Sequence, residues 1–227
     1  MTTIVITGVS RGLGQALFEQ LCAMDNLELV TLSRNTPLAG NATITNTHFG
    51  ADFANLQDLS LCLSRLESFL AEKKRQVIFV SNAGDIGPVK KAGNYEQQEI
   101  VKSIHINYTA PVMIVNSLLS ATQVTGLVNI SSGAAQHPIG GWGMYCSTKA
   151  ATYSFFNVVA EENPAIKVLQ VDPGVIDTAM QQEIRNASKE SFSRLNDFKM
   201  LKETNRLQTP TEAAIKVLNQ IKEARII

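Results

Sequence analysis

The sequence has few of the residues that mark secreted or metal-dependent proteins. It contains three cysteines, Cys22, Cys62 and Cys146, and their spacing is neither paired nor metal-like. This argues against a disulfide framework and favours a reduced, cytoplasmic setting. The three histidines are also far apart in the sequence, so no metal site is expected.

Long apolar runs and a charge excess are also lacking. No stretch approaches the length of a membrane span, and the first predicted strand follows Met1 so closely that no signal peptide is expected. Twenty Lys and Arg residues balance twenty Asp and Glu residues. Neither a nucleic acid nor a membrane is therefore expected as a partner.

Strand and helix patterns alternate along the chain, without an internal repeat or a low-complexity linker. Strands are predicted at 3–7, 27–32, just before 52, 77–80, 126–130 and 165–171, and helices at 15–24, 54–74, 95–121, 144–161 and 211–222. Pro111 is expected near a helix start or a kink. This alternation predicts an α/β fold, in which helices cover both faces of a doubly wound parallel sheet. At 227 residues, a single domain is expected.

A glycine-rich turn, Gly-Val-Ser-Arg-Gly-Leu-Gly, joins the first predicted strand to the first predicted helix. Glycines let a backbone turn tightly and approach a pyrophosphate, and the helix N-terminus offers free N–H groups. A turn without a ligand is the alternative, but three glycines in this position favour a dinucleotide site of Rossmann type. The residues expected at this turn of the site are Gly8, Ser10, Arg11, Gly12, Leu13 and Gly14.

Tyr145 and Lys149 are four residues apart in a predicted helix and therefore share one face of it. A free tyrosine has a pKa of about 10. A neighbouring ammonium group is expected to lower that pKa, so that the phenol can exchange a proton with a carbonyl or alcohol oxygen.

Further motifs follow in order. Three motifs follow predicted strands: Asp52-Phe53 follows the third, Asn82-Ala83-Gly84 follows the fourth and Pro173-Gly174 follows the sixth. Asn107 lies in the long middle helix, and Ser132 precedes Tyr145 by thirteen positions. Together with the Gly-x-x-x-Gly-x-Gly turn, this series resembles the short-chain dehydrogenase/reductase family over residues 2–178, and more loosely to 222. The resemblance implies one Rossmann-type domain over 1–227, with a cofactor half at about 1–125 and a catalytic half at about 126–227.

The resemblance also implies roles for four residues, Asn107, Ser132, Tyr145 and Lys149. In a reduction, the hydroxyls of Ser132 and Tyr145 would bind the substrate carbonyl, and Tyr145 would supply the proton. Lys149 would hold the nicotinamide ribose and tune Tyr145. Asn107 would hold, through its backbone, a water that links Lys149 to solvent. A strand-end serine and a helix-capping asparagine are the plain alternatives.

The expected cofactor is NADP(H). The second predicted strand ends in Ser33-Arg34-Asn35, whereas an NAD site would carry an acid there. Arg34 and Arg11 suit a 2′-phosphate, although solvated surface arginines are the alternative. By resemblance, further cofactor contacts are Asp52, Phe53, Asn82, Ala83, Gly84, Tyr145, Lys149, Pro173, Gly174, Val175, Ile176 and Thr178.

Ile86, Trp142, Met144 and Met180 are expected to line a mainly apolar substrate pocket, unless they pack against the sheet. The polar, mixed segment 177–207 is expected to be a mobile lid. Residues 172–181 resemble the branch that contains sepiapterin reductases and bacterial benzil reductases. Since the chain shows no counterpart of the acid that anchors a pterin, a benzil-type vicinal diketone is the favoured substrate.

Three alternatives stay open at this point. The chain is also compatible with an NADP-dependent 3-oxoacyl reductase, with an alcohol oxidoreductase, or with a cofactor-sensing protein that lacks turnover. By resemblance, a homodimer or homotetramer is expected. The family usually has a further C-terminal strand, which is expected to be short or missing here because the chain stops at Ile227.

Overall fold

The computed structural model describes residues 2–37, 45–71 and 76–227. Within them lies a six-stranded parallel sheet in the order β3-β2-β1-β4-β5-β6, which confirms the predicted sheet. The strands are β1 (Thr2–Thr7), β2 (Leu27–Ser33), β3 (Asn46–Gly50), β4 (Gln76–Ser81), β5 (Gln123–Ile130) and β6 (Lys167–Val171). The strand order reverses between β1 and β4, and ligands of such sheets bind at the carboxyl ends of the strands around this point.

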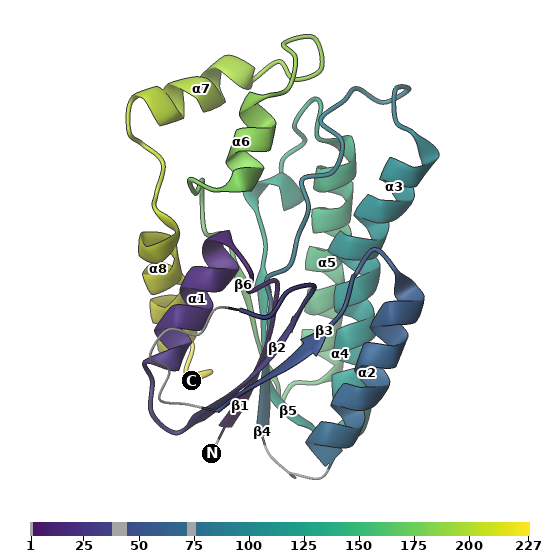
Figure 1. The fold of residues 1–227 in the computed structure, drawn as a ribbon, viewed down its shortest axis with the longest axis vertical. Coiled ribbons are helices and arrows are strands. Elements are labelled where there is room, and N and C mark those ends of the chain that lie inside the picture. Colours follow the sequence, from purple (N-terminus) through teal and green to yellow (C-terminus); the bar gives the residue numbers. More distant parts are fainter. Residues whose placement is uncertain (1, 38–44, 72–75) are drawn as a thin grey trace.

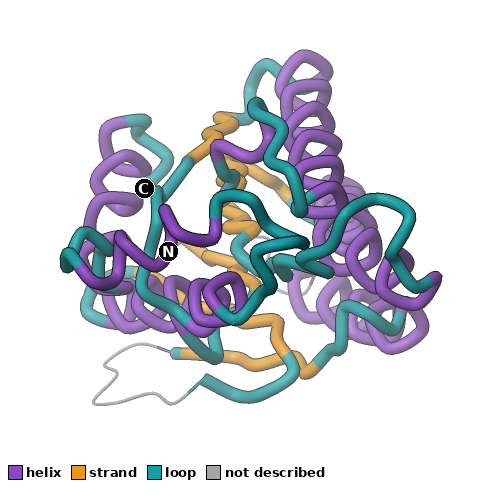
Figure 2. The backbone as a smooth tube through the Cα atoms, turned by 90° about the horizontal axis from the view of Figure 1, so that it is seen from above, coloured by secondary structure: helices purple, strands orange, loops and turns teal. Residues whose placement is uncertain are grey.

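Helices cover both faces of the sheet (Figure 1). They are α1 (Gly12–Cys22), α2 (Leu56–Ala71), α3 (Gln97–Ile104), α4 (Ala110–Ala121), α5 (Gly143–Glu162), α6 (Ala179–Arg185), α7 (Leu195–Glu203) and α8 (Pro210–Glu223). One face carries α1 and α8, the other carries α2, α4 and α5, and α6 and α7 lie above the carboxyl ends of the strands. Figure 2 shows the same strands from above, between the two groups of helices. Among the described helices, none is long and apolar enough to cross a membrane.

The alternation of side chains along the strands supplies both cores. In β1, Ile4 and Ile6 pack with α1 and α8, whereas Val5 packs on the opposite side with α2 and α4. Successive side chains of a strand point to opposite faces, so a strand that is covered twice needs an uninterrupted apolar run. This requirement explains the composition of residues 4–6.

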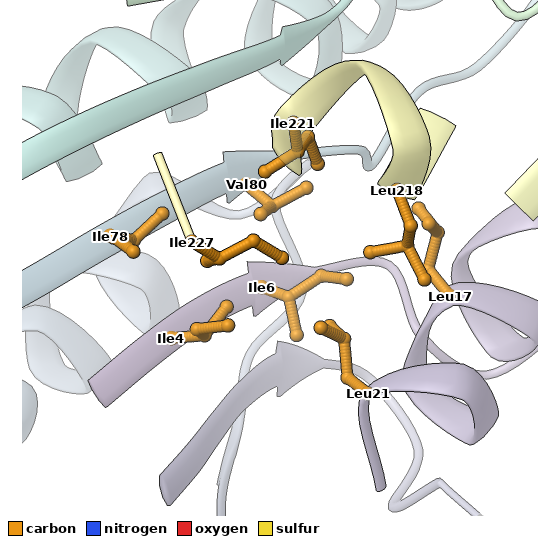
Figure 3. A pocket seen from close by; sticks show the side chains of 9 residues that line it. All are labelled: Ile4, Ile6, Leu17, Leu21, Ile78, Val80, Leu218, Ile221 and Ile227. Carbon is orange, nitrogen blue, oxygen red and sulfur yellow. The ribbon is translucent and has the colours of Figure 1, made fainter. Parts of the chain in front are cut away.

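Packing on the α1/α8 side leaves a small apolar hollow between the two helices and the strands β1 and β4 (Figure 3). It is lined by Ile4, Ile6, Leu17, Leu21, Ile78, Val80, Leu218, Ile221 and Ile227. Its volume of about 10 Å³ is close to the smallest space that holds one water molecule. A wall without polar groups gives such a water no partner, so this hollow is part of the core and not a ligand site.

Several predicted helices differ from those in the structure. The predicted helix 95–121 consists of α3, a π-helical turn (His105–Thr109) and α4, and Pro111 lies in the first turn of α4, as expected. The helix predicted at 54–74 begins at Leu56, and residues 72–74 lie outside the described part of the chain. Helices α6 and α7 are not predicted by the sequence analysis. In the described residues no strand follows β6, which agrees with the expected loss of a C-terminal strand.

Candidate active site

The glycine turn between β1 and α1 is shaped to take an anion. Gly8 and Gly12 have φ values of +69° and +58°, which other residues adopt only with strain. A Cβ on Gly14 would lie 2.1 Å from the carbonyl oxygen of Gly8. Arg11 occupies the N-cap of α1, and its side chain makes no capping hydrogen bond. The turn and the helix N-terminus therefore fit the pyrophosphate of a dinucleotide.

The other predicted residues of the turn divide by burial. Ser10 and Arg11 are exposed, whereas Leu13 is buried in the core beneath α1. Arg34 is exposed where β2 ends, and β2 lies next to β1, so both arginines stand at one edge of the sheet. After β3, Phe53 is buried and the Asp52 carboxylate accepts a hydrogen bond from the backbone N–H of Ala54 at 3.1 Å.

A hydrogen-bond network ties the Asn82–Gly84 turn to the glycine turn. The Thr7 hydroxyl accepts from the backbone N–H groups of Asn82 and Ala83, both at 3.0 Å. The Asn82 amide donates to the carbonyls of Thr7 at 2.9 Å and Gly8 at 3.1 Å. Thr7 was not predicted as part of the site, although a threonine at a strand end directly before Gly8 was an available signal.

Tyr145 lies in the first turns of α5 and is only 8% exposed. Burial raises the pKa of Tyr145 to about 12. The charges of Asp172 and Cys146 also raise this pKa, whereas the hydrogen bond with Ser132 lowers it because it favours the phenolate. The predicted lowering of this pKa by Lys149 is therefore wrong for this arrangement, because desolvation outweighs the favourable contacts. Ser132 follows β5, and its hydroxyl also accepts from the backbone N–H of Ala134 at 3.2 Å.

Lys149 is buried on the same face of α5. Its ammonium lies 5.9 Å from the centroid of the Tyr145 ring and donates to the Ile130 carbonyl at 2.8 Å. Burial lowers the pKa of Lys149 to about 8, while the negative charge of Asp172 acts in the opposite direction. Gly84 stands opposite this ammonium, since a Cβ on Gly84 would lie 3.7 Å from Lys149 Nζ.

Asn107 lies in the π-helical turn and is 3% exposed. Its side-chain amide donates to the Asp85 carbonyl at 2.7 Å and to the Thr148 hydroxyl at 3.2 Å, and its Oδ1 accepts from the Asp85 N–H at 2.8 Å. Its backbone carbonyl accepts from the Thr152 hydroxyl at 2.6 Å. Asn107 thus anchors the loop after β4 to α5. Thr148 and Thr152 were not predicted as part of the site, although they follow Tyr145 at helical spacing on α5.

Three of the four predicted pocket residues, Ile86, Trp142 and Met180, belong to or pack against one apolar cluster to which the segment 177–207 contributes. Trp142 is stacked on Phe192, with ring centroids 5.1 Å apart, and meets Tyr145 edge to face at 5.7 Å and Phe198 at 5.2 Å. Ile86 belongs to the same buried cluster, Met180 packs against it, and Met144 lies beside Gly87 instead. Trp142 is only 5% exposed, so it is packed inside this cluster, whereas the sequence analysis expected it to line a substrate pocket. The expectation of a polar, mixed segment overlooked Phe192 and Phe198.

The segment after β6 approaches the glycine turn. A Cβ on Gly12 would lie 3.2 Å from the Thr178 methyl group, and Gly174 has a φ of +78°. Gln208 donates to the Pro173 carbonyl at 3.1 Å, and Ile176 forms a β-bridge with Gln208. The predicted residues 173–178 and 8–14 thus meet, with Val175 exposed beside them. No group of three His, Cys, Asp or Glu residues suited to a metal occurs in the ranges 2–37, 45–71 and 76–227.

A doubly wound sheet with a glycine-rich turn at its carboxyl edge, and with Ser132, Tyr145 and Lys149 gathered where β4 and β5 end, defines a Rossmann-type oxidoreductase. The family model for short chain dehydrogenases matches residues 2–189. The chain belongs to the short-chain dehydrogenase/reductase family and is an oxidoreductase that acts on carbonyl or hydroxyl groups.

Two curated relatives and one solved structure illustrate this membership. The chain is 32% identical to a benzil reductase ((S)-benzoin forming) of Bacillus cereus over 96% of its own length and 93% of the relative's. It is 32% identical to the sepiapterin reductase of Bos taurus, over 82% of the chain and 77% of the relative. The crystal structure of the KRED1-Pglu enzyme superposes with a TM-score of 0.83 at 26% identity, covering 94% and 92% of the two chains.

Proposed function

We propose that this protein is an NADPH-dependent carbonyl reductase that transfers hydride to a small hydrophobic ketone, and that a vicinal diketone of benzil type is its substrate class. The observation that carries the proposal is the pair of hydroxyls, Ser132 and Tyr145, beneath an apolar roof made by Trp142 and Phe192. The similarity to a benzil reductase over nearly the whole chain supports the choice of substrate.

The residues of the site suit the proton chemistry of a reduction. A Tyr145 pKa of about 12 means that the phenol carries its proton at neutral pH, as a general acid must. The hydroxyls of Ser132 and Tyr145 would donate to the carbonyl oxygen of the ketone and stabilise the negative charge that develops there. Tyr145 then gives its proton to that oxygen. NADPH supplies the hydride when bound.

The residues around this pair hold and orient the reactants. The turn 8–14 would take the pyrophosphate, Lys149 the nicotinamide ribose, and Arg11 and Arg34 the 2′-phosphate. Asn107 keeps the loop after β4 against α5 and would hold a relay water with the second lone pair of its carbonyl, since Thr152 occupies the first. The remaining contacts are proposed at 52–53, 82–84 and 173–178.

Three further features belong to the same proposal. The segment 177–207 works as a lid that opens to admit the ketone, because Tyr145 is 8% exposed beneath it. Residues 1–125 form the cofactor half and residues 126–227 the catalytic half. The protein is a cytoplasmic homodimer or homotetramer, a state that light scattering coupled to gel filtration measures.

The test is oxidation of NADPH and, separately, of NADH by the purified protein. Benzil, other vicinal diketones, sepiapterin and a simple aromatic ketone serve as substrates. We expect rapid diketone-dependent loss of NADPH, abolished in Tyr145→Phe and retained in Tyr153→Phe, which removes a hydroxyl from the same helix. Tight NADPH binding without turnover of any of these substrates would contradict the reductase and favour a cofactor-sensing protein. A preference for NADH would contradict the roles of Arg11 and Arg34.

A further inference from the structure

Asp172 is the first residue after β6, and it lies close to Ser132, the serine of the proposed active site. The strands β5 and β6 are parallel neighbours, with Ile130 opposite Val171. The backbone N–H of Ser131 donates to the Val171 carbonyl at 2.7 Å, so the two strands stay paired to their ends. The residues that follow, Ser132 and Asp172, therefore emerge at the same edge of the sheet.

The two oxygens of the Asp172 carboxylate have different surroundings. Oδ1 accepts a hydrogen bond from the backbone N–H of Gly174 at 2.9 Å and so closes the turn after β6. Oδ2 makes no hydrogen bond or ion pair with any described residue, and it would lie 3.3 Å from a Cβ built on Gly133, the residue directly after Ser132. A negative charge without a direct ion-pair partner thus lies beside the residue that follows Ser132.

We propose that Asp172 is a specificity-determining residue of this site, whose carboxylate disfavours ketones with a negative charge beside the reacting carbonyl and thereby selects neutral vicinal dicarbonyls over 2-oxo acids. The inference rests on the proposed function and names its substrate class more closely. In a 2-oxo acid the carboxylate is bonded directly to the reacting carbonyl carbon. Asp172 lies beside Gly133 and acts electrostatically on Tyr145. A substrate charge next to a carbonyl held by Ser132 and Tyr145 would therefore be repelled by Asp172, and close like charges discriminate by about tenfold.

Lys149 is the nearby cation that feels the Asp172 charge, but the two side chains make no direct ion pair. The Lys149 ammonium gives its hydrogen bond to the Ile130 carbonyl instead. The groups that face Tyr145 from α6 and α7 are apolar, namely Ile184 and Phe198. Because Asp172 is exposed, salt screens its charge, and the selectivity depends on ionic strength.

The same charge acts on the catalytic pair. Asp172 raises the pKa of Tyr145, which also faces Ser132 and Cys146, and it raises the pKa of Lys149. A neutral residue in its place therefore lowers both pKa values. The pKa of Lys149, about 8, is the one that lies in an accessible range. If turnover needs the ammonium form of Lys149, the fall of kcat/KM at alkaline pH moves to lower pH without Asp172.

The experiment compares methyl benzoylformate with benzoylformate, a neutral and an anionic form of one 2-oxo compound, using the full chain and NADPH. Asp172→Asn is the informative variant because its amide oxygen still accepts from Gly174 while the charge is lost. We expect the ester-to-acid ratio of kcat/KM to fall about tenfold in this variant. We also expect the fall of kcat/KM for the ester at alkaline pH to move to lower pH. Asp172→Glu keeps the charge and retains most of the ratio.

A second measurement needs no variant. In the unaltered protein, added salt should narrow the ester-to-acid ratio, since screening weakens the repulsion. An unchanged ratio in Asp172→Asn, an equal loss in Asp172→Glu, or a ratio insensitive to salt would overturn the assignment of Asp172. Failure of the unaltered protein to reduce benzil or the ester while it binds NADPH is a different result, because it would overturn the proposed function itself.

Discussion

The ammonium of Lys149 lies over the face of the Tyr145 ring, 5.9 Å from its centroid, and gives its hydrogen bond to the Ile130 carbonyl instead of the phenol. Both side chains are buried, and burial moves the two pKa values toward the neutral forms, to about 12 for Tyr145 and about 8 for Lys149. The phenol keeps its proton more firmly, whereas the amine loses its proton more readily. Access for water would therefore raise the pKa of Lys149 back toward its ordinary value.

The first prediction concerns stability against pH. The folded-state pKa of Lys149 lies below its unfolded value of about 10.4, so between pH 8 and that value the unfolded chain binds more protons. This group therefore makes the free energy of unfolding rise with pH across that window. In Lys149→Met, without cofactor, the contribution disappears, and near neutral pH the variant should be more stable by about 1–3 kcal/mol.

Urea unfolding at neutral and at moderately alkaline pH measures this effect. The difference between the unaltered protein and the variant isolates Lys149, because the raised pKa values of Tyr145 and Cys62 act in the opposite direction in both proteins. Lys199→Met, on the exposed side of α7, serves as the control. A difference that stays constant with pH would contradict the prediction.

The second prediction concerns the hydrogen bonds that join Thr7 to the turn Asn82–Gly84. Thr7→Val keeps the shape of the side chain but leaves the N–H groups of Asn82 and Ala83 without their acceptor. We expect the free energy of unfolding to fall by about 2 kcal/mol or more and the affinity for NADPH to fall with it. Thr125→Val is the matched control, since its hydroxyl makes a single long hydrogen bond of 3.4 Å. Equal effects of the two substitutions would contradict the role of Thr7.

The third prediction concerns the choice of cofactor. Arg34→Glu replaces a cation with an acid at the end of β2, where an acid would accept from a ribose hydroxyl. We expect KM for NADPH to rise by about 10- to 100-fold, with KM for NADH unchanged or lower. Arg206→Glu changes the same charge at another exposed position and should not alter the preference. A parallel rise for both cofactors would indicate that Arg34 does not contact the 2′-phosphate.

Local patterns predicted most of the frame of the site. Gly8, Gly12 and Gly14 lie within one turn between a strand and a helix, and Tyr145 and Lys149 share a helix face by spacing alone. Such patterns span only a few residues, so they can be recognised without knowledge of the rest of the fold. The parallel sheet followed from the alternation of apolar strands and helices in the same way.

Contacts between distant segments were not predictable. Thr7 and Asn82 are 75 residues apart, and nothing near either residue indicates their pairing. The pKa of Tyr145 is raised because the side chain is buried in a cluster with Phe198 and Ile184. These two residues belong to a segment whose sequence is mainly polar. The π-helical turn at Asn107 interrupts a pattern that reads as one continuous helix.

The last prediction concerns that covering segment. Phe192 is fully buried, stacks on Trp142 and meets Phe198 edge to face at 5.3 Å, so it is a main apolar anchor of residues 177–207. Phe192→Ala removes the stack and leaves a cavity, which weakens the docking of the segment by about 3 kcal/mol or more. Since the sheet and its flanking helices keep their own cores, we expect protease cleavage to increase selectively within 177–207, and KM for the ketone to rise more than KM for NADPH. Met200→Ala, at a position 57% exposed, is the control. Cleavage spread evenly over the chain would instead mean that the segment unfolds only with the whole domain, and that it is no independent lid.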